Sequence, residues 1–558
     1  MANFYQEDPH LSSLLKKYLP VSFYQWADRE LHAFGEYCAG EIDERAVYTD
    51  REGKPRLVKY DKMGEEVSRV WVNEGYKRTV EETYNTGIVG HIHKEIPDLG
   101  RKGNYVYSFA QGYLLSHAEP GFYCPVTLTM ATAYLIDHYA DKGLRERYLP
   151  HVLATGEIEL YEGATFLTER QGGSDVGANQ VRALETADGY RIYGEKYFAS
   201  NAGQCGVAMV LARIEGAKEG TKGLSLFLVP WEENRQDQKL HIRRLKDKLG
   251  VRAVPSAEVE FDGAKAYLVG EAEQGFAYMV EALNLSRICN AVASLGIMKR
   301  AFLEARDYAS NRTAFGSKLT DLPMIQDTLT TLAAKQQVET SAVFAMIHHF
   351  DQLLCANPNQ PEEEQILLRL YIAILKKETA EQAIHFAHEA LEMHGGNGYI
   401  EDFVTPRLLR DAQVLTVWEG TGNILGLEVL RLVEKYQADH LFFQEVSRRL
   451  AALPKNLQGL REQLELEIKR MADWLEEVKK ADRDIRTYYC KEIAEKFAAV
   501  FESAVALEDA AEGNGRNKDV AEVYLQSTWN SGTYQAEPMT IRYFKRIVET
   551  NHSAAIST

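Results

Sequence analysis

A single carboxylate lies in an unusual setting late in the chain. Glu419 stands between a large aromatic residue, Trp418, and the glycine-rich turn 420–422. An apolar run precedes this turn, and a helix-like pattern follows it. A carboxylate that is shielded from water beside an aromatic ring can act as a general base. Glu419 is therefore the first candidate for chemistry.

The glycines at 420, 422 and 426 allow two other interpretations of the same stretch. Their spacing is off by one residue from a dinucleotide-binding fingerprint, and no βαβ units flank it, so we do not expect a Rossmann domain. The turn could also be purely structural, with Thr421 or Asn423 capping the helix that follows. The residues alone leave the structural and the chemical interpretation open.

Three further segments combine glycine, hydroxyl, aromatic and basic residues. The turn in FLTERQGGSDVGAN (166–179) could bind a phosphate or the polar edge of a planar cofactor through its N–H groups. In EKYFASN (195–201), Phe198 could stack on a ring or pack in the core. In ASNRTAFG (309–316), Arg312 could pair with a pyrophosphate, because its planar fork donates two bonds. Alternatively, Arg312 could be solvated while Phe315 is packed. Taken singly, each segment also fits a structural role.

The elements that must position these residues change in character along the chain. The pattern is helical over 11–40 and mainly helical over 80–156, with a polar, extended stretch between them. Short β-forming runs separated by Gly, Asp and Asn fill 163–270 and predict a small antiparallel sheet or barrel. Long helices with apolar residues at three- and four-residue spacing follow Gly275 and predict a four-helix bundle, and 440–558 is again helical.

Helices and strands that are segregated in this way define an α+β fold that is mainly α. We expect an N-terminal arm and helix, an N-terminal helical domain, a central antiparallel β domain, a C-terminal four-helix bundle and a helical extension. The expected boundaries of these five parts are 1–74, 75–160, 161–272, 273–438 and 439–558.

Composition narrows the class of protein. The 558 residues carry a formal net charge of −17, and the segment 440–558 has 17 Lys and Arg against 19 Asp and Glu, which argues against nucleic-acid binding. The six cysteines are scattered and form no CxxC pair, and we recognise no signal or transit peptide, so we expect a cytoplasmic protein. No apolar run reaches about 18 residues, so we expect no membrane partner. The histidine-rich stretch 385–394 lacks the paired ExxH helices of a di-metal bundle, so we expect no metal site.

The order of the motifs is more specific than any one of them. TERQGGSD, EKYFASN, KDKLGVRAVPSAEVEF, SNRTAFG and HGGNGYIEDFVTPRLLRDAQVLTVWEGTGN follow one another as in the acyl-CoA dehydrogenase family, which the chain resembles over about 75–435. The resemblance implies the three-domain fold predicted above, FAD as the cofactor, an acyl-CoA substrate and a homodimer or homotetramer. It also implies an electron-transferring flavoprotein as electron acceptor, although a family oxidase would use oxygen. The polar arm, the helical extension and VWEGTGN resemble the AidB-like branch, some of whose members have been linked to DNA.

The resemblance implies a set of flavin contacts. The family's TExxxGSD turn contacts flavin and substrate, and a later strand places an aromatic residue on the ring and a hydroxyl near its N5. Here Phe198 and Ser200 replace Trp and Thr, which keeps the chemistry but reduces the stacking area. Arg312 and Phe315 match the pair that reaches the FAD of a neighbouring subunit, and Glu392 stands where the family has Gln. The implied cofactor-binding residues are Leu167, Thr168, Gly173, Ser174, Phe198, Ser200, Arg312, Phe315, Glu392, Gly395, Gly396, Thr421 and Asn423.

The resemblance also implies the base and the substrate contacts. Glu419 matches the carboxylate that removes a proton from the acyl α-carbon. Ser286 occupies the base position that some branches use instead, so Glu419 is the only matching base. Asn284 and Arg287 match positions that contact the CoA portion, although Asp is common where Asn284 stands. The implied substrate-binding residues are Ser174, Asn284, Arg287, Trp418 and Gly420.

The expected reaction converts an acyl-CoA thioester to a 2,3-enoyl-CoA. The α-proton of a thioester is too weak an acid for a free carboxylate with a pKa of about 4.3, so we expect the bound substrate to exclude water and raise the basicity of Glu419. Hydride then passes from the β-carbon to flavin N5. The AidB-like features leave one alternative open, a flavoprotein associated with nucleic acid that turns over acyl-CoA weakly or not at all.

Overall fold

The computed structural model describes residues 3–355, 362–513, 515–530, 532 and 534–549. The chain divides into two compact units. One unit spans Tyr37–Cys289, and the other joins Met1–Glu36 to Asn290–Thr558. The N-terminal segment therefore belongs to the same unit as the C-terminal half of the chain.

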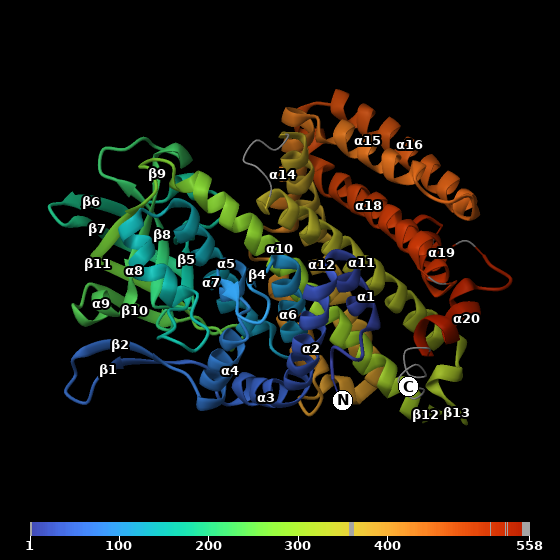
Figure 1. The fold of residues 1–558 in the computed structure, drawn as a ribbon, viewed down its shortest axis with the longest axis horizontal. Helices are drawn as coiled ribbons and strands as arrows, with labels where there is room; N and C mark the ends of the chain where they lie inside the picture. Colours follow the sequence, from blue (N-terminus) through green and yellow to red (C-terminus); the bar gives the residue numbers. More distant parts are fainter. Residues whose placement is uncertain (1–2, 356–361, 514, 531, 533, 550–558) are drawn as a thin grey trace. The chain divides into compact units, whose positions relative to one another are not determined.

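Helices and a β-hairpin occupy the first part of the 37–289 unit. The hairpin of β1 (Arg56–Tyr60) and β2 (Glu66–Trp71) is the polar stretch predicted to be extended, and it projects as an arm in Figure 1. α6 and α7 are buried along most of their length, so they form the helical core of this unit. The helices are α3 (Asp43–Arg51), α4 (Glu74–Asn85), α5 (Gly90–His93), α6 (Tyr105–Ala118), α7 (Pro120–Tyr139) and α8 (Lys142–Val152), and β3 (Glu95–Ile96) pairs with β4 (Arg101–Lys102).

Seven strands form the central sheet of this unit. Its order is β10-β11-β7-β6-β8-β5, with β9 pairing with both β11 and β8. Most pairs are antiparallel as predicted, but β8 pairs in parallel with β5 and with β6. A parallel pair needs a long connection, which the strands between β5 and β8 supply. The strands are β5 (Gly163–Phe166), β6 (Arg182–Thr186), β7 (Gly189–Ser200), β8 (Val207–Ile214), β9 (Leu224–Pro230), β10 (Leu240–Leu245) and β11 (Ser256–Val269), and the short α9 (Trp231–Gln236) follows β9.

Long helices build the other unit. α12 packs against both α11 and α14, as the predicted bundle requires, and the boundary between the two units falls within α10. The helices are α1 (Pro9–Tyr18), α2 (Val21–Tyr37), α10 (Gly275–Asn311), α11 (Pro323–Cys355), α12 (Glu362–His394), α13 (Thr405–Leu415) and α14 (Gly422–Tyr436).

A helical extension follows the bundle, as the sequence predicts. Its central helix α18 contacts α11, α12 and α14 of the bundle, and it also contacts α15 and α16 of the extension (Figure 1). A Cβ atom at Gly426 of α14 would lie 2.9 Å from the backbone of Cys490, the first residue of α18. The glycine therefore allows α14 and α18 to approach each other closely. The helices are α15 (Ala438–Ala451), α16 (Gln458–Lys480), α17 (Arg483–Tyr488), α18 (Cys490–Glu512), α19 (Gly515–Trp529) and α20 (Met539–Phe544).

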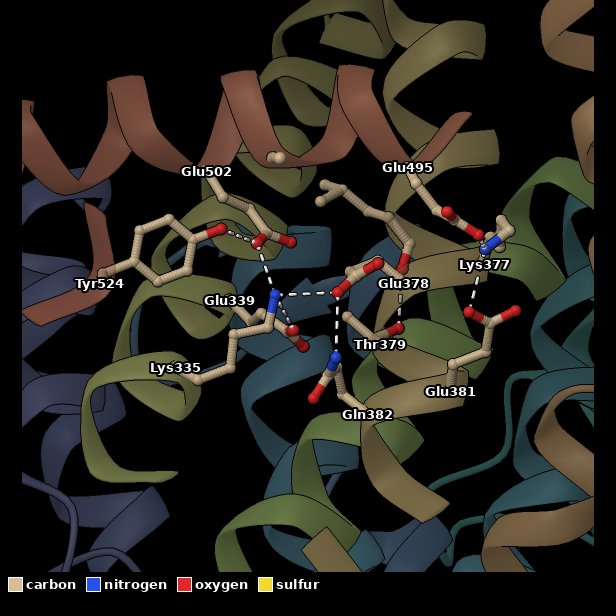
Figure 2. A network of polar contacts seen from close by, with 12 residues as sticks. Lys335, Glu339, Lys377, Glu378, Thr379, Glu381, Gln382, Glu495, Glu502 and Tyr524 are labelled. Atoms are coloured by element: carbon tan, nitrogen blue, oxygen red, sulfur yellow. Dashed lines mark hydrogen bonds and ion pairs between the residues drawn. The ribbon is translucent and has the colours of Figure 1, made fainter. Parts of the chain in front are cut away.

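A buried charged network joins the extension to the bundle. The Lys335 ammonium of α11 lies 2.9 Å from carboxylate oxygens of Glu339, Glu378 and Glu502 (Figure 2). Tyr524 of α19 donates a hydrogen bond to Glu502 at 2.5 Å. Burial raises the pKa of Glu339 and of Glu502. Because buried charges are costly unless they are paired, this network fixes how α18 and α19 dock on α11 and α12.

The observed elements agree with the predicted fold class. Helices precede and follow one central sheet, and strands and helices are segregated along the chain. Over the described residues, no helix combines the length and the apolar character that crossing a membrane requires. The cysteines whose side chains are described, Cys38, Cys124, Cys205, Cys289 and Cys490, are free thiols.

Candidate active site

Glu419 lies in a tight turn between α13 and α14. The amides of Val417 and Trp418 both donate to the Val414 carbonyl, which ends α13. The chain then turns sharply, because Glu419 has φ +58° and Gly420 has φ +108°. A non-glycine residue in the left-handed region costs roughly 1–2 kcal/mol. Such strain persists only where the surroundings hold it, and it is concentrated at functional sites.

Lys376 supports this turn from α12. Its ammonium donates hydrogen bonds to the carbonyl oxygens of Trp418, at 2.9 Å, and Gly420, at 2.6 Å. The side chain is buried. These two acceptors flank Glu419, so one cation contacts the backbone on both sides of the candidate base. Lys376 was not among the residues predicted from the sequence. Its position directly after the apolar run YIAIL was the one available signal, because a lysine that is buried with such a run needs polar partners.

Thr421, two residues after Glu419, does not cap α14 with its side chain. Thr421 stands at the N-cap position of α14, but its side chain makes no capping hydrogen bond. Thr421 and Asn423 are both exposed. The interpretation that these residues only cap the helix is therefore not supported for Thr421, and both side chains are open to a ligand.

The predicted glycine pair lies at the end of α12. Gly395 and Gly396 begin a short 3₁₀ turn, and both are exposed. Glu392 is exposed one turn earlier, with a carboxylate oxygen 3.8 Å from His388 Nε2. A carboxylate at this position can only accept hydrogen bonds, whereas the amide found in the family can also donate.

Arg312 and Phe315 lie at a small hairpin after α10. The hairpin consists of β12 (Thr313–Ala314) and β13 (Ser317–Lys318), joined by Phe315 and Gly316. Both turn residues have positive φ, +53° and +81°, as a type I′ turn requires. Phe315 is 96% exposed, and Arg312 is also exposed. A large aromatic side chain held at an exposed tip is suited to contact another molecule.

Hydrogen bonds from neighbouring residues hold the TERQGGSD turn of the 37–289 unit. Asn179 donates to the Leu167 carbonyl at 2.8 Å, and the Tyr197 amide of β7 donates to the Thr168 carbonyl at 3.0 Å. Gly173 and Ser174 are exposed at the end of the turn. A Cβ atom at Gly173 would lie 2.6 Å from Thr168 Oγ1, so any larger residue there would force the Thr168 side chain to shift.

A β-bulge aims Phe198 outward. The pairing of β7 with β11 shifts between two residue pairs, Ala199–Ala257 and Lys196–Val259, so Tyr197 and Phe198 together oppose the single residue Glu258. Lys196 and Ala199 are both buried, while Phe198 is 54% exposed. The alternative that Phe198 packs in the core is therefore wrong. Bulges occur next to active sites, where they redirect a side chain.

The hydroxyl predicted to lie near the cofactor belongs to Ser200, the last residue of β7 and the second residue after Phe198. Ser200 Oγ lies 3.2 Å from Ser256 Oγ on β11, so this hydroxyl is held by a neighbour. The Lys246 ammonium lies 4.8 Å from the centre of the Phe198 ring. The structure thus brings an exposed ring, a hydroxyl and a cation together beside the TERQGGSD turn, to which Tyr197 is hydrogen-bonded.

The predicted CoA contacts share one face of α10. Arg287 Nη1 donates to Asn284 Oδ1 at 3.1 Å, one helical turn apart. Ser286, the residue at the alternative base position, is buried. A serine hydroxyl cannot replace a carboxylate as the base. Of the two predicted base positions, both within the described residues, only that of Glu419 therefore carries a suitable side chain.

These residues fit a planar, anionic cofactor and a thioester substrate. The exposed Phe198 ring offers a stacking surface, and the turn around Gly173 and Ser174 offers backbone N–H groups. Arg312 offers a fork for a pyrophosphate. These residues lie in two different units, with Phe198 and the turn in the 37–289 unit and Arg312 and Glu419 in the other.

Comparisons with known proteins place the chain in a family. The model of the acyl-CoA dehydrogenase C-terminal domain matches residues 273–433, that of the acyl-CoA dehydrogenase middle domain matches 164–264, and that of the adaptive response protein AidB N-terminal domain matches 1–156. Acyl-CoA dehydrogenase family member 11 of Caenorhabditis elegans is 31% identical over 93% of this chain and 86% of its own length. The putative acyl-CoA dehydrogenase AidB of Escherichia coli is 32% identical over 68% of this chain and 69% of its own length. The chain belongs to the acyl-CoA dehydrogenase family and is an oxidoreductase.

Solved structures agree with this assignment. Caenorhabditis elegans ACDH-11 in complex with C11-CoA matches with a TM-score of 0.88 and 26% identity, over 100% of this chain and 96% of that one. The apo form of Bd2924 matches with a TM-score of 0.81 and 30% identity, over 95% and 98%. A Bacillus anthracis acyl-CoA dehydrogenase complexed with FAD shares the fold, with a TM-score of 0.72 and 20% identity over 86% and 90%.

Proposed function

We propose that this protein dehydrogenates an acyl-CoA thioester to a 2,3-enoyl-CoA, with Glu419 as the base. The observation that carries the proposal is the setting of Glu419, a carboxylate in a left-handed turn whose two flanking carbonyls bond one buried ammonium. The complex of ACDH-11 with C11-CoA supports an acyl-CoA substrate. The general reaction is that of the family to which the chain belongs.

The cofactor is FAD. When bound, FAD supplies an acceptor for the hydride that leaves the substrate β-carbon. The Glu419 carboxylate takes the α-proton, so the substrate loses one proton and one hydride and gains one carbon–carbon double bond. Phe198 would cover one face of the flavin ring, while Ser200, Thr168, Gly173 and Ser174 would contact its polar edge. Trp418 beside the base would exclude water from the acyl chain.

Other residues would hold the remaining parts of the ligands. Arg287 and Asn284 would contact the CoA portion, and Leu167, Thr421, Asn423, Glu392, Gly395 and Gly396 would complete the FAD contacts. Arg312 and Phe315 would reach the FAD of a second copy of the chain, which makes a homodimer or homotetramer the working form. The exposed Phe315 supports this assembly, because covering a solvated phenyl ring with a partner lowers the free energy of the assembly.

The reduced flavin would pass its two electrons to an electron-transferring flavoprotein, as part of fatty acid metabolism. We place the protein in the cytoplasm, which the free thiols of its described cysteines support. The alternative partner, nucleic acid, is disfavoured by the net charge of −17.

Anaerobic mixing with a panel of short, branched, aromatic and long acyl-CoAs tests the function. The yellow holoenzyme should bleach as at least one of them reduces the flavin. Reoxidation that is faster with an electron-transferring flavoprotein than with air would support that acceptor. A panel without bleaching would contradict the proposed reaction and favour the nucleic-acid-associated alternative, which salt-dependent DNA binding would then reveal.

A further inference from the structure

Glu419 adopts a backbone conformation that its own residue type does not favour. Its φ of +58° is followed by +108° at Gly420, so two successive residues turn the chain before α14 begins at Gly422. Glycine would adopt φ +58° without strain, but glycine has no carboxylate. A glutamate here requires surrounding contacts that keep the turn in place.

Lys376 supplies such contacts at the residue before Glu419 and at the residue after it. The Trp418 carbonyl belongs to the peptide that enters Glu419, and the Gly420 carbonyl belongs to the second peptide after it. Both accept a hydrogen bond from the same ammonium, at 2.9 and 2.6 Å. Rotation about the backbone bonds of Glu419 would pull at least one of these carbonyls away from the cation.

The support comes from a rigid element. Lys376 lies in the middle of α12, a helix of 33 residues that packs against α11, α13, α14 and α18. Its side chain is 1% exposed, so the ammonium is held within the packed bundle. A buried ammonium with fixed acceptors has little freedom to reorient, and its bonds to the carbonyls are stronger than those between neutral groups.

We propose that Lys376 is the positioning residue of the base. It acts through the carbonyls of Trp418 and Gly420 and holds the Glu419 side chain where it can reach a substrate. This inference rests on the proposed role of Glu419 as the base. It adds a residue that lies 43 positions earlier in the chain and that bonds the backbone of the turn.

The adjacent lysine provides a matched control. Lys377 is also buried on α12, but its ammonium bonds the carboxylates of Glu381 and Glu495 at 2.9 Å. Lys376→Met and Lys377→Met each remove one buried ammonium from the same helix. Only the first removes hydrogen bonds to the turn.

The test compares both variants as holoenzymes in two measurements. Hydrogen exchange of the backbone amides of residues 416–421 reports opening of the turn without any reaction. The rate of anaerobic flavin reduction at saturating acyl-CoA, expressed per bound flavin, reports the chemistry independently of the amount of folded protein. For Lys376→Met we expect exchange at least about tenfold faster and reduction about 10- to 100-fold slower, with FAD content and acyl-CoA affinity little changed. For Lys377→Met we expect wild-type values in both, and Lys376→Arg should recover part of the lost rate.

Two results separate a failure of this inference from a failure of the proposed function. If Glu419→Gln abolishes flavin reduction while Lys376→Met exchanges or reacts like the wild type, the positioning role is wrong and the base stands. If Glu419→Gln reduces its flavin at the wild-type rate, the base is wrong and the role of Lys376 falls with it. If Lys376→Met does not fold, the same two measurements are made on Lys376→Gln. Hydrogen exchange and a flavin-reduction rate like those of the wild type in Lys376→Gln would overturn the inference.

Discussion

The Lys196 ammonium on β7 lies 2.8 Å from a carboxylate oxygen of Glu169, the second residue of the TERQGGSD turn. Both side chains are buried. The same carboxylate accepts hydrogen bonds from the amides of Gln180 and Val181, and Lys196 also donates to the Leu167 carbonyl. The ion pair and its hydrogen bonds thus connect three segments: the start of the turn, the residues that follow its end, and the strand that carries Phe198.

Lys196→Met should loosen this turn. The change leaves the Glu169 carboxylate buried without its cation, which typically costs about 3–5 kcal/mol. We expect a lower free energy of unfolding and weaker FAD binding, measured by chemical denaturation and by flavin titration. Lys265→Met is the control, because Lys265 pairs with Glu233 in a half-exposed setting and should cost about 1 kcal/mol or less. Equal losses in the two variants would contradict the bracing role of Lys196.

Phe315→Ser should affect assembly and cofactor binding rather than folding. Phe315 is 96% exposed, so its loss removes no packing inside the chain. We expect an unchanged melting temperature for the protein without FAD, together with weaker FAD retention and a shift to smaller species in light scattering. Tyr488→Ser, at another exposed aromatic residue on α17, is the control. A Phe315→Ser protein that retains FAD and assembles like the wild type would place this ring outside the cofactor site.

Glu162 should make stability depend on pH. Burial raises the pKa of Glu162 to about 7 from an ordinary value of 4.5, while hydrogen bonds from Tyr84 and Asn201 oppose the shift. A carboxyl group whose pKa is raised in the folded state stabilises the fold below its unfolded pKa, and this contribution is lost as the pH rises through 7. Relative to Glu162→Gln, the wild type should therefore lose about 2–3 kcal/mol of unfolding free energy between pH 5 and pH 8.

Chemical denaturation of both proteins at several pH values measures that difference. Subtracting the variant from the wild type removes the contribution of all other titrating groups. A difference that is constant between pH 5 and pH 8 would mean that the Glu162 carboxyl is ionised in the folded protein throughout.

Motif order and periodicity predicted most of this fold. Runs with a two-residue period became strands, and the long helices followed the three- and four-residue spacing after Gly275. Local alternation could not predict the exposure of Phe198, because the bulge opposite Glu258 depends on pairing with a strand about 60 residues later. The parallel pairs of β8 with β5 and β6 likewise depend on contacts between distant segments.

In the candidate site, too, the sequence predicts local features but not those that depend on contacts between distant segments. Glu419 stood out because an acid between an aromatic residue and glycines is a local signal. Lys376 did not, because its role depends on α12 packing against α13 and α14. Lys376 and Lys377 look equivalent in the sequence, yet Lys376 bonds the turn that carries Glu419 and Lys377 bonds a carboxylate of the helical extension.

The role of Glu419 is tested most directly by flavin reduction in Glu419→Gln. The amide keeps the size of the side chain but cannot take the α-proton, so FAD and acyl-CoA should bind while the rate of anaerobic flavin reduction falls at least about 100-fold. Stopped-flow absorbance with an acyl-CoA that bleaches the wild type gives that rate. Flavin reduction at the wild-type rate in Glu419→Gln would contradict the assignment of this carboxylate as the base.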